Sequence, residues 1–581
     1  MNFTPSKLPA RVAWLPKIKL QDKKVITRLV LGATPKLLPK IARKEKVHLD
    51  NAKMKDPVVL QGILHRHCRS SLATLFLVIL CIVAFVLARL LDSSSNFPGN
   101  YSPKSIFAGI TFPKYPRLHD PWKNPKRNPI EIPMTCSHTN STVQITCPTS
   151  YYPLKFSKSD ENLDSDLDPD PDAAMQPTCP DYFCWIHEDL WPWRETGITL
   201  GMVEAAKRTA SFRLVVVNGT VYVETYRRSF QTRDVFTQWG ILQLLRLYPG
   251  RLPDLDMIFS CADQPTVVKQ LYPNPNASAP PALFSYDGDD ATFDIVFPDW
   301  SFWGWPEIAI KPWEQLSKDL KEGNERMQWV DKEPQAYWKG NAKLTLSRKD
   351  LLRCNVSGKQ DWNARIYQQD WHSEERQDFK NSNLANQCIH RFKIYIEGFG
   401  WSVSQKYILA CDSVTLMVKP RYYEFFSRSL IPLQHYWPIR DINKCRSIKY
   451  AVEWGNNHQE EAQAIGKAAS RFVQEELQMK YVYDYMFHLL KEYAKLLKYK
   501  PSVPPNAIEV CSESMACPAD GLVKKYMMDS VVTGPSNEAP CTMPPPYGPA
   551  TFHSILERKE SRIRQAETLE EQYLNSQNNH K

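Results

Sequence analysis

One stretch, residues 392–438, constrains the fold more than any other part of this 581-residue chain. An apolar run ends in a turn built on Gly398 and Gly400, and Ser402 then opens a segment with apolar residues at mixed, largely helical spacing. A strand, a glycine turn and a helix in this order are typical of open α/β sheets, where ligands bind beside such a turn. Because Gly-x-Gly before a serine is also a common tight turn, the rest of the chain decides its meaning.

Other segments repeat the α/β pattern. The residues flanking Asn218-Gly219 predict a β-hairpin over residues 212–226. A helical pattern over 233–248 is followed by a buried strand over 252–260, and the carboxylate of Asp263 comes directly after it. The sequence therefore predicts an α/β fold with two Rossmann-like lobes and a central cleft.

An apolar segment, residues 71–91, precedes these units. It is uncharged from Ser71 to Ala88, which is long enough to span a bilayer, although a buried core helix is the alternative. Residues 1–69 carry 16 Lys and Arg but 4 Asp and Glu, so this end is expected to stay cytosolic. The prediction is a single-pass type II membrane protein.

The net charge of +10 is confined to that tail, because the rest of the chain sums to about −2. The positive net charge therefore does not indicate that the rest of the chain binds a nucleic acid. The expected organisation is a cytosolic tail (1–69), a signal anchor (70–91), a lumenal stem (92–178), an N-terminal lobe on the acceptor side (179–330), a C-terminal lobe on the donor side (331–500) and a Pro- and Cys-rich, partly helical tail (501–581).

Twelve of the 14 cysteines follow the apolar segment, and an even number in an oxidising compartment indicates disulfides. Cys136 with Cys147 and Cys179 with Cys184 are plausible local pairs. No second Cys or His cluster accompanies them, so zinc is not expected. Glycosylation sequons agree with a lumenal location and occur at Asn100, Asn140, Asn218, Asn276 and Asn355.

An aromatic loop, residues 298–306, offers a surface for a sugar ring. Trp300, Phe302 and Trp303 are its candidate platform residues. A packed core loop explains the same residues equally well.

Several segments in fixed order carry a family resemblance. They are GRLPD (250–254), CADQP (261–265), PDWSFW (298–303), AYWKG (336–340), GFGWSVSQKYILACDS (398–413) and YYEFFSRSLIPLQHYWPI (422–439). Over residues 180–500 the chain resembles the Rumi-type protein O-glucosyltransferase family, and within it the land-plant membrane-anchored group.

The resemblance implies an inverting, metal-independent transferase of the GT-B type that uses UDP-glucose or UDP-xylose and no other cofactor. Inversion needs one general base to take the acceptor's proton. The family's base matches Asp263, although Ala262 stands where the family has Arg. A helix cap or turn is the structural alternative for Asp263.

The resemblance also implies residues that bind the donor. Gly340 and Asn341 match a turn of the family, in which Lys339 replaces an Arg, and Arg348 matches an Arg that binds the diphosphate. A surface salt bridge is the alternative role for Arg348.

The stretch at 392–438 contributes the other half of the implied donor site. Gly398, Ser402 and Lys406 match the family pattern, but Ser404 replaces an Arg. The diphosphate contact of that Arg is either lost or taken over by Lys406. Glu424 matches a carboxylate that binds ribose or sugar hydroxyls.

The expected function is transfer of glucose or xylose from a UDP-sugar to a hydroxyl of a polysaccharide or a protein serine. The alternative, motivated by Ala262 and Ser404, is an inactive lumenal glycan-binding or scaffold protein on the same fold. Because the final residues lack a KDEL-like signal, the Golgi membrane is the expected location and the endoplasmic reticulum the second choice.

Overall fold

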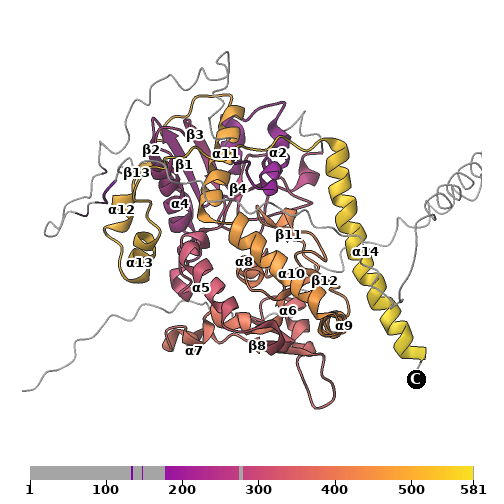
Figure 1. Ribbon diagram of the computed structural model, residues 1–581. Helices are drawn as coiled ribbons and strands as arrows, with labels where there is room; N and C mark the ends of the chain where they lie inside the picture. Colours follow the sequence, from indigo (N-terminus) through magenta and orange to yellow (C-terminus); the bar gives the residue numbers. More distant parts are fainter. Residues whose placement is uncertain (1–131, 135, 137–146, 148–176, 274–278, 580–581) are drawn as a thin grey trace, which may run out of the picture. The chain divides into compact units, whose positions relative to one another are not determined.

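The computed structural model describes residues 132–134, 136, 147, 177–273 and 279–579 (Figure 1). The expected membrane segment, residues 71–91, and the basic tail before it lie outside the described residues. Among the helices that are described, none combines the length and the apolar character needed to cross a membrane.

The first lobe contains a mixed sheet with the strand order β13-β2-β1-β3-β4-β6. Neighbouring strands pair antiparallel from β13 to β3, whereas β3, β4 and β6 are parallel. The first lobe therefore has a mixed sheet that agrees with the predicted α/β fold, and the predicted hairpin forms part of its antiparallel half. The strands are β1 (Phe212–Val217), β2 (Thr220–Thr225), β3 (Leu255–Phe259), β4 (Phe284–Ser285), β6 (Ile295–Val296) and β13 (Ile508–Val510).

The predicted hairpin is present, with Val217 opposite Thr220. Asn218 and Gly219 between them have φ angles of 50° and 79°, which Asn and Gly adopt more readily than other residues. Strand β3, predicted as buried, is buried at every position.

The second lobe contains a sheet in which every pairing is parallel, with the order β12-β10-β9-β7-β8. Parallel strands end at one edge, and the turn at Gly398 follows β9 at that edge. The strands are β7 (Glu333–Gly340), β8 (Ala364–Gln368), β9 (His390–Tyr395), β10 (Val414–Val418) and β12 (Trp437–Ile439). A short ribbon, β5 (Gly288–Asp289) with β11 (Tyr422–Tyr423), joins the lobes.

The helices surround these sheets (Figure 1). Their bounds are α2 (Trp185–Asp189), α3 (Leu200–Ala206), α4 (Arg233–Leu247), α5 (Trp313–Glu325), α6 (Leu346–Leu351), α7 (Trp371–Arg376), α8 (Ser404–Leu409), α9 (Lys444–Asn457), α10 (Gln459–Arg471), α11 (Met479–Leu496), α12 (Ser512–Ala516), α13 (Gly521–Asp529) and α14 (Pro549–Asn579).

The chain crosses back to the first lobe after α10. A π-helical turn, Phe472–Glu476, separates α10 from α11, and α11 then packs on α4 and β3 of the first lobe. The tail continues there, because β13 joins the first sheet and α12 packs on α4, whereas α14 packs on α9 and β12. The chain therefore leaves the second lobe at the π-helical turn, while residue 500 stays the boundary predicted from the sequence.

Five disulfides are present among the described residues. They are Cys136–Cys517, Cys147–Cys511, Cys179–Cys541, Cys354–Cys445 and Cys388–Cys411. Cys184 and Cys261 are free and buried. Disulfides were expected and are present, but both local pairings were wrong.

Candidate functional site

A cavity of about 780 Å³ opens between the two lobes. Its walls include Asp263, four residues beyond β3, and Gly340, the last residue of β7. Gly398, three residues beyond β9, lines the same cavity. The cavity therefore lies at the carboxyl ends of strands from both sheets, where α/β folds bind ligands.

Asp263 presents a carboxylate to this cavity. Its side chain is 49% exposed, and its Oδ1 accepts a hydrogen bond of 2.8 Å from Nη1 of Arg233 at the start of α4. Arg233 is buried, donates to the Cys261 carbonyl at 3.2 Å and lies 4.5 Å from the Trp300 ring. One carboxylate oxygen is thus fixed by a rigid cation, while the side chain as a whole remains accessible.

The loop that carries Asp263 rests on the second lobe. Gln264 donates from Nε2 to the Phe399 carbonyl (2.6 Å) and to the Tyr422 hydroxyl (2.9 Å). Gly400 packs so tightly here that an added Cβ would overlap the Asp263 carbonyl oxygen. The turn at Gly398 and Gly400 therefore packs against the loop that carries Asp263, and it also lines the cavity.

Arg348, on α6, is the cation beside this turn. It is buried, and its guanidinium donates to the carbonyls of Glu397 (2.8 Å) and Ile396 (3.0 Å) and to Oγ of Ser402 (3.4 Å). Burial lowers its pKa, but an arginine stays charged. Because no carboxylate of the described chain pairs with it, its charge is available to an anion.

The cavity brings together most of the predicted site residues. Its lining includes Asp263, Trp300, Gly340, Asn341, Arg348, Gly398 and Ser402. Ser404, where the resemblance implies an Arg, lies there too.

Lys406 and Glu424 do not line the cavity. Lys406 is fully buried and pairs with Asp299 at 2.6 Å. Burial lowers the pKa of Lys406, but the nearby Asp299, Tyr407 and Glu424 together outweigh this and leave the pKa raised. Glu424 is buried nearby, and burial raises its pKa to about 8. These residues form a buried charge cluster behind the site, so Lys406 does not supply the cation missing at Ser404.

Phe302 and Trp303 also differ from expectation. Both are completely buried, and Nε1 of Trp303 donates to the Tyr483 hydroxyl at 2.9 Å. They belong to the core of the first lobe and offer no platform to a sugar. Trp300 lines the cavity but is itself 1% exposed.

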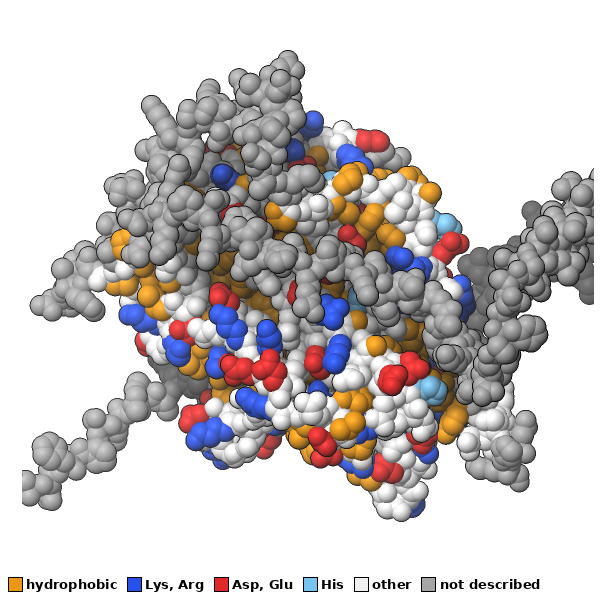
Figure 2. Space-filling view, viewed as in Figure 1, with side chains coloured by type: hydrophobic (Ala, Val, Ile, Leu, Met, Phe, Trp, Pro, Cys, Tyr) orange, Lys and Arg blue, Asp and Glu red, His pale blue; other side chains and the backbone are white. Residues whose placement is uncertain are grey.

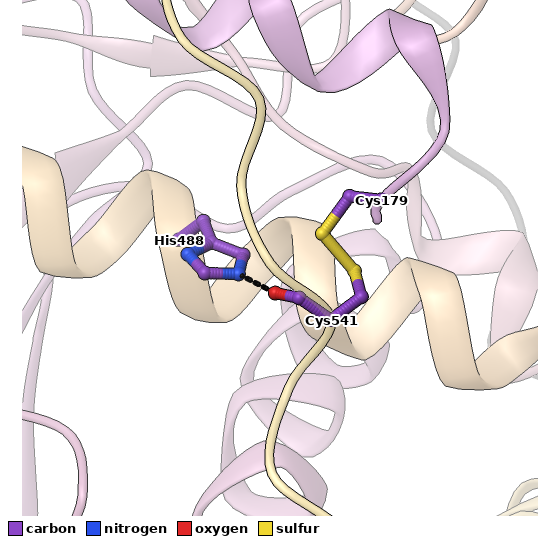
Figure 3. A group of neighbouring side chains, drawn as sticks. All are labelled: Cys179, His488 and Cys541. Carbon is purple, nitrogen blue, oxygen red and sulfur yellow. Dashed lines mark hydrogen bonds between the residues drawn. A yellow bond between two sulfur atoms is a disulfide. The ribbon is translucent and has the colours of Figure 1, made fainter. Parts of the chain in front are cut away.

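Cys179, Cys541 and His488 are the one group of close potential metal ligands found among the described residues (Figure 3). The two sulfurs are bonded to each other, and Nε2 of His488 forms a 2.8 Å hydrogen bond with the Cys541 carbonyl. Sulfurs in a disulfide are not thiolates, so this group is a structural bridge.

The profile of glycosyl transferase family 90 matches residues 174–570, which include both lobes and every residue of the cavity. The chain belongs to glycosyl transferase family 90. The expected Rumi-type family is confirmed, while membership of a land-plant group stays a prediction.

Several relatives are about 25% identical to the chain over the aligned residues. Protein O-glucosyltransferase 1 of Bos taurus is 26% identical over 345 residues, 56% of this chain and 83% of the relative. The Homo sapiens protein of the same name is 26% identical over 338 residues (55% and 81%). O-glucosyltransferase rumi of Drosophila melanogaster is 24% identical over 367 residues (60% and 85%).

Sequence reasoning missed the partners of the predicted base. Arg233 opens a helix 30 residues before Asp263, and Gln264 appeared as one letter of a motif. No local spacing links Arg233 to Asp263, because the contact depends on how the loop after β3 folds toward the start of α4. Ala262 was the one indication in the sequence. It replaces the Arg that the resemblance implies beside Asp263, so another cation was needed to pair with this carboxylate.

Arg233→Met should slow sugar transfer by about 10- to 100-fold, because the base loses the contact that fixes its position. The affinity for UDP should stay within about twofold, since Arg233 is already paired with Asp263. Turnover and UDP titration of the purified variant check this, with Arg233→Lys as the charge-retaining control. Unchanged turnover in Arg233→Met would remove Arg233 from the site.

Proposed function

We propose that the protein transfers glucose or xylose from a UDP-sugar to a hydroxyl group, with inversion at the anomeric carbon. The arrangement that carries the proposal is an accessible carboxylate, Asp263, in one cavity with an unneutralised buried cation, Arg348. A transferase that displaces a diphosphate needs both a proton acceptor and positive charge at the leaving group. The names of the relatives agree with glucose transfer to protein.

Asp263 acts as the general base in this proposal. Its carboxylate takes the proton of the acceptor hydroxyl while that oxygen forms a bond to the anomeric carbon. The bond from the anomeric carbon to the diphosphate oxygen breaks, and UDP leaves with the electron pair. Arg348 stabilises the negative charge that develops on UDP. The donor itself requires no metal in this scheme.

Two exposed phenylalanines offer aromatic surface to a bound sugar or acceptor. Phe230 is 66% exposed and Phe399 is 54% exposed, and both line the cavity that contains Asp263. Exposed aromatic rings stack on the C–H face of a sugar and also pack on apolar side chains. These two rings support a polysaccharide or a glycoprotein acceptor. They take the role that was expected of the buried residues Phe302 and Trp303.

The lumen of the Golgi, with the chain anchored through residues 71–91, is the proposed location. Disulfides among the described residues support an oxidising compartment. On the face shown in Figure 2, acidic and basic side chains are intermixed, so this face offers no basic patch for a nucleic acid.

The test is UDP release by the purified full-length protein with UDP-glucose or UDP-xylose, in the presence of serine-containing domains or xylan oligosaccharides. One donor and acceptor pair should release UDP well above the level of Asp263→Asn. Equal release by both proteins, with acceptor binding retained, would favour the second candidate, an inactive glycan-binding scaffold. The residues Ala262 and Ser404 motivate that candidate.

Arg348→Met should raise the KM for the donor by about 10- to 100-fold, because a charge-assisted contact to the diphosphate is lost. The kcat should fall as well, since the leaving group loses its stabilisation. Initial rates over a donor titration check both values. Arg353→Met, on the exposed side of the same segment, is the matched control and should behave as wild type.

A further inference from the structure

Four cations line the cavity within the described chain: Arg233, Lys339, Arg348 and Lys393. Two of them are neutralised, since Arg233 pairs with Asp263 and Lys339 pairs with Glu374 at 2.7 Å. Arg348 and Lys393 form no ion pair with any described carboxylate. The cavity therefore keeps two basic side chains that form no ion pair, although the charge of Glu397 acts on Arg348.

Lys393 lies on β9, and it faces away from the core of the second lobe. Its neighbours Phe392 and Ile394 are buried in that core, so strand alternation directs Lys393 to the opposite side. Its side chain is buried, and Nζ donates to Sγ of Cys411 at 3.2 Å. This sulfur belongs to the Cys388–Cys411 disulfide and is a weak acceptor.

Among the described residues, no carboxylate forms an ion pair with Lys393. Burial, and then the nearby Lys332, lower its pKa to about 7. His390 on the same strand is also within range, and its own pKa is lowered to about 4 by burial and the two lysines. Asp412 is the acidic group in this region, but its carbonyl accepts from Lys332 and its charge acts on that lysine. A buried ammonium without a partner is costly, and such groups are typical of functional sites.

We propose that Lys393 is a second cation of the donor site and, with Arg348, supplies the positive charge that a nucleoside diphosphate requires. The inference rests on the proposed function. Ser404 stands where the resemblance implies an Arg, so one cation is missing from the donor site. Lys406 was expected to replace it but is paired with Asp299 behind the cavity. The cation comes instead from the neighbouring strand.

The positions along β9 fit one ligand. Lys393 lies three residues before Ile396, whose carbonyl holds Arg348, a separation of roughly 10 Å along a strand. Attraction between charges persists over such a distance where burial lowers the local dielectric constant, and both Lys393 and Arg348 are buried. An anion in the cavity stabilises the protonated lysine, so binding near pH 7 should take up a proton.

Calorimetric titration of UDP into the full-length protein at pH 7, in two buffers of different ionisation enthalpy, measures this uptake. Wild type should take up about half a proton more than Lys393→Met, because a group with a pKa near 7 is half neutral before binding. Lys393→Met should bind UDP about tenfold more weakly. Lys393→Arg should keep the affinity and lose the uptake, since arginine is already charged.

Lys349→Met is the control, because Lys349 is an exposed lysine of α6 that does not line the cavity. It should keep the proton uptake. Wild-type affinity and uptake in Lys393→Met would overturn the inference alone, whereas wild-type protein that binds no UDP would overturn the proposed function and the inference together. If thermal unfolding shows that Lys393→Met is misfolded, Lys393→Arg decides: retained uptake overturns the inference and lost uptake with retained affinity supports it.

Discussion

Asp263→Asn is expected to lower the turnover number by about 10²- to 10⁴-fold, the contribution of a positioned general base. An amide has nearly the shape of the carboxylate but does not accept the acceptor's proton at neutral pH. UDP should still bind, because the anionic carboxylate of Asp263 is paired with Arg233 and is not a ligand for the diphosphate. Turnover and UDP titration separate the two effects.

Asp290→Asn is the control for this substitution. Asp290 is an exposed carboxylate of the same lobe that does not line the cavity, so its variant should retain wild-type turnover. Full activity of Asp263→Asn would mean that another group takes the proton. Another residue of the cavity would then have to be the base. The match of Asp263 to the family motif would in that case reflect a structural role.

Gly400→Ala is expected to lower both stability and turnover. The new methyl group would overlap the Asp263 carbonyl oxygen and lie 2.9 Å from Oδ2 of Asp287. One of the two loops has to move, which we expect to cost about 1–3 kcal/mol of unfolding free energy. A shift of the base by about 1 Å is enough to slow transfer by about 100-fold.

Thermal unfolding and UDP release measure these two effects. Gly358→Ala is the matched control, because nothing lies within 4 Å of the Cβ that it adds. Wild-type stability and turnover in Gly400→Ala would show that the base loop has room to move without consequence. In that case the hydrogen bonds of Gln264 would be the contacts that hold the loop.

Local chemistry made part of the fold predictable. The hairpin at Asn218-Gly219 follows from two residues that tolerate positive φ, and β3 follows from a continuous apolar run. The second sheet is parallel as expected, because its strands alternate with helical segments. Asp263 and Gly398 could be placed in one cavity since each follows a strand end.

Long-range packing made the rest unpredictable. The aromatic loop at 298–306 could be a platform or a core, and only its burial shows that Phe302 and Trp303 are core. Lys406 fits a sequence pattern for a phosphate contact, yet it lies on the inner face of α8 against Asp299. Cysteine spacing favoured local pairs, whereas Cys136 pairs with a residue 381 positions away.

Three of the disulfides join the start of the folded region to its end. Cys136, Cys147 and Cys179 bond to partners 381, 364 and 362 residues further along. None of these bonds can close before nearly the whole chain has been synthesised and has entered an oxidising compartment. A chain that ends before Cys511 would leave three thiols unpaired, whereas a single proteolytic cut between the bridged ends would leave both fragments covalently attached.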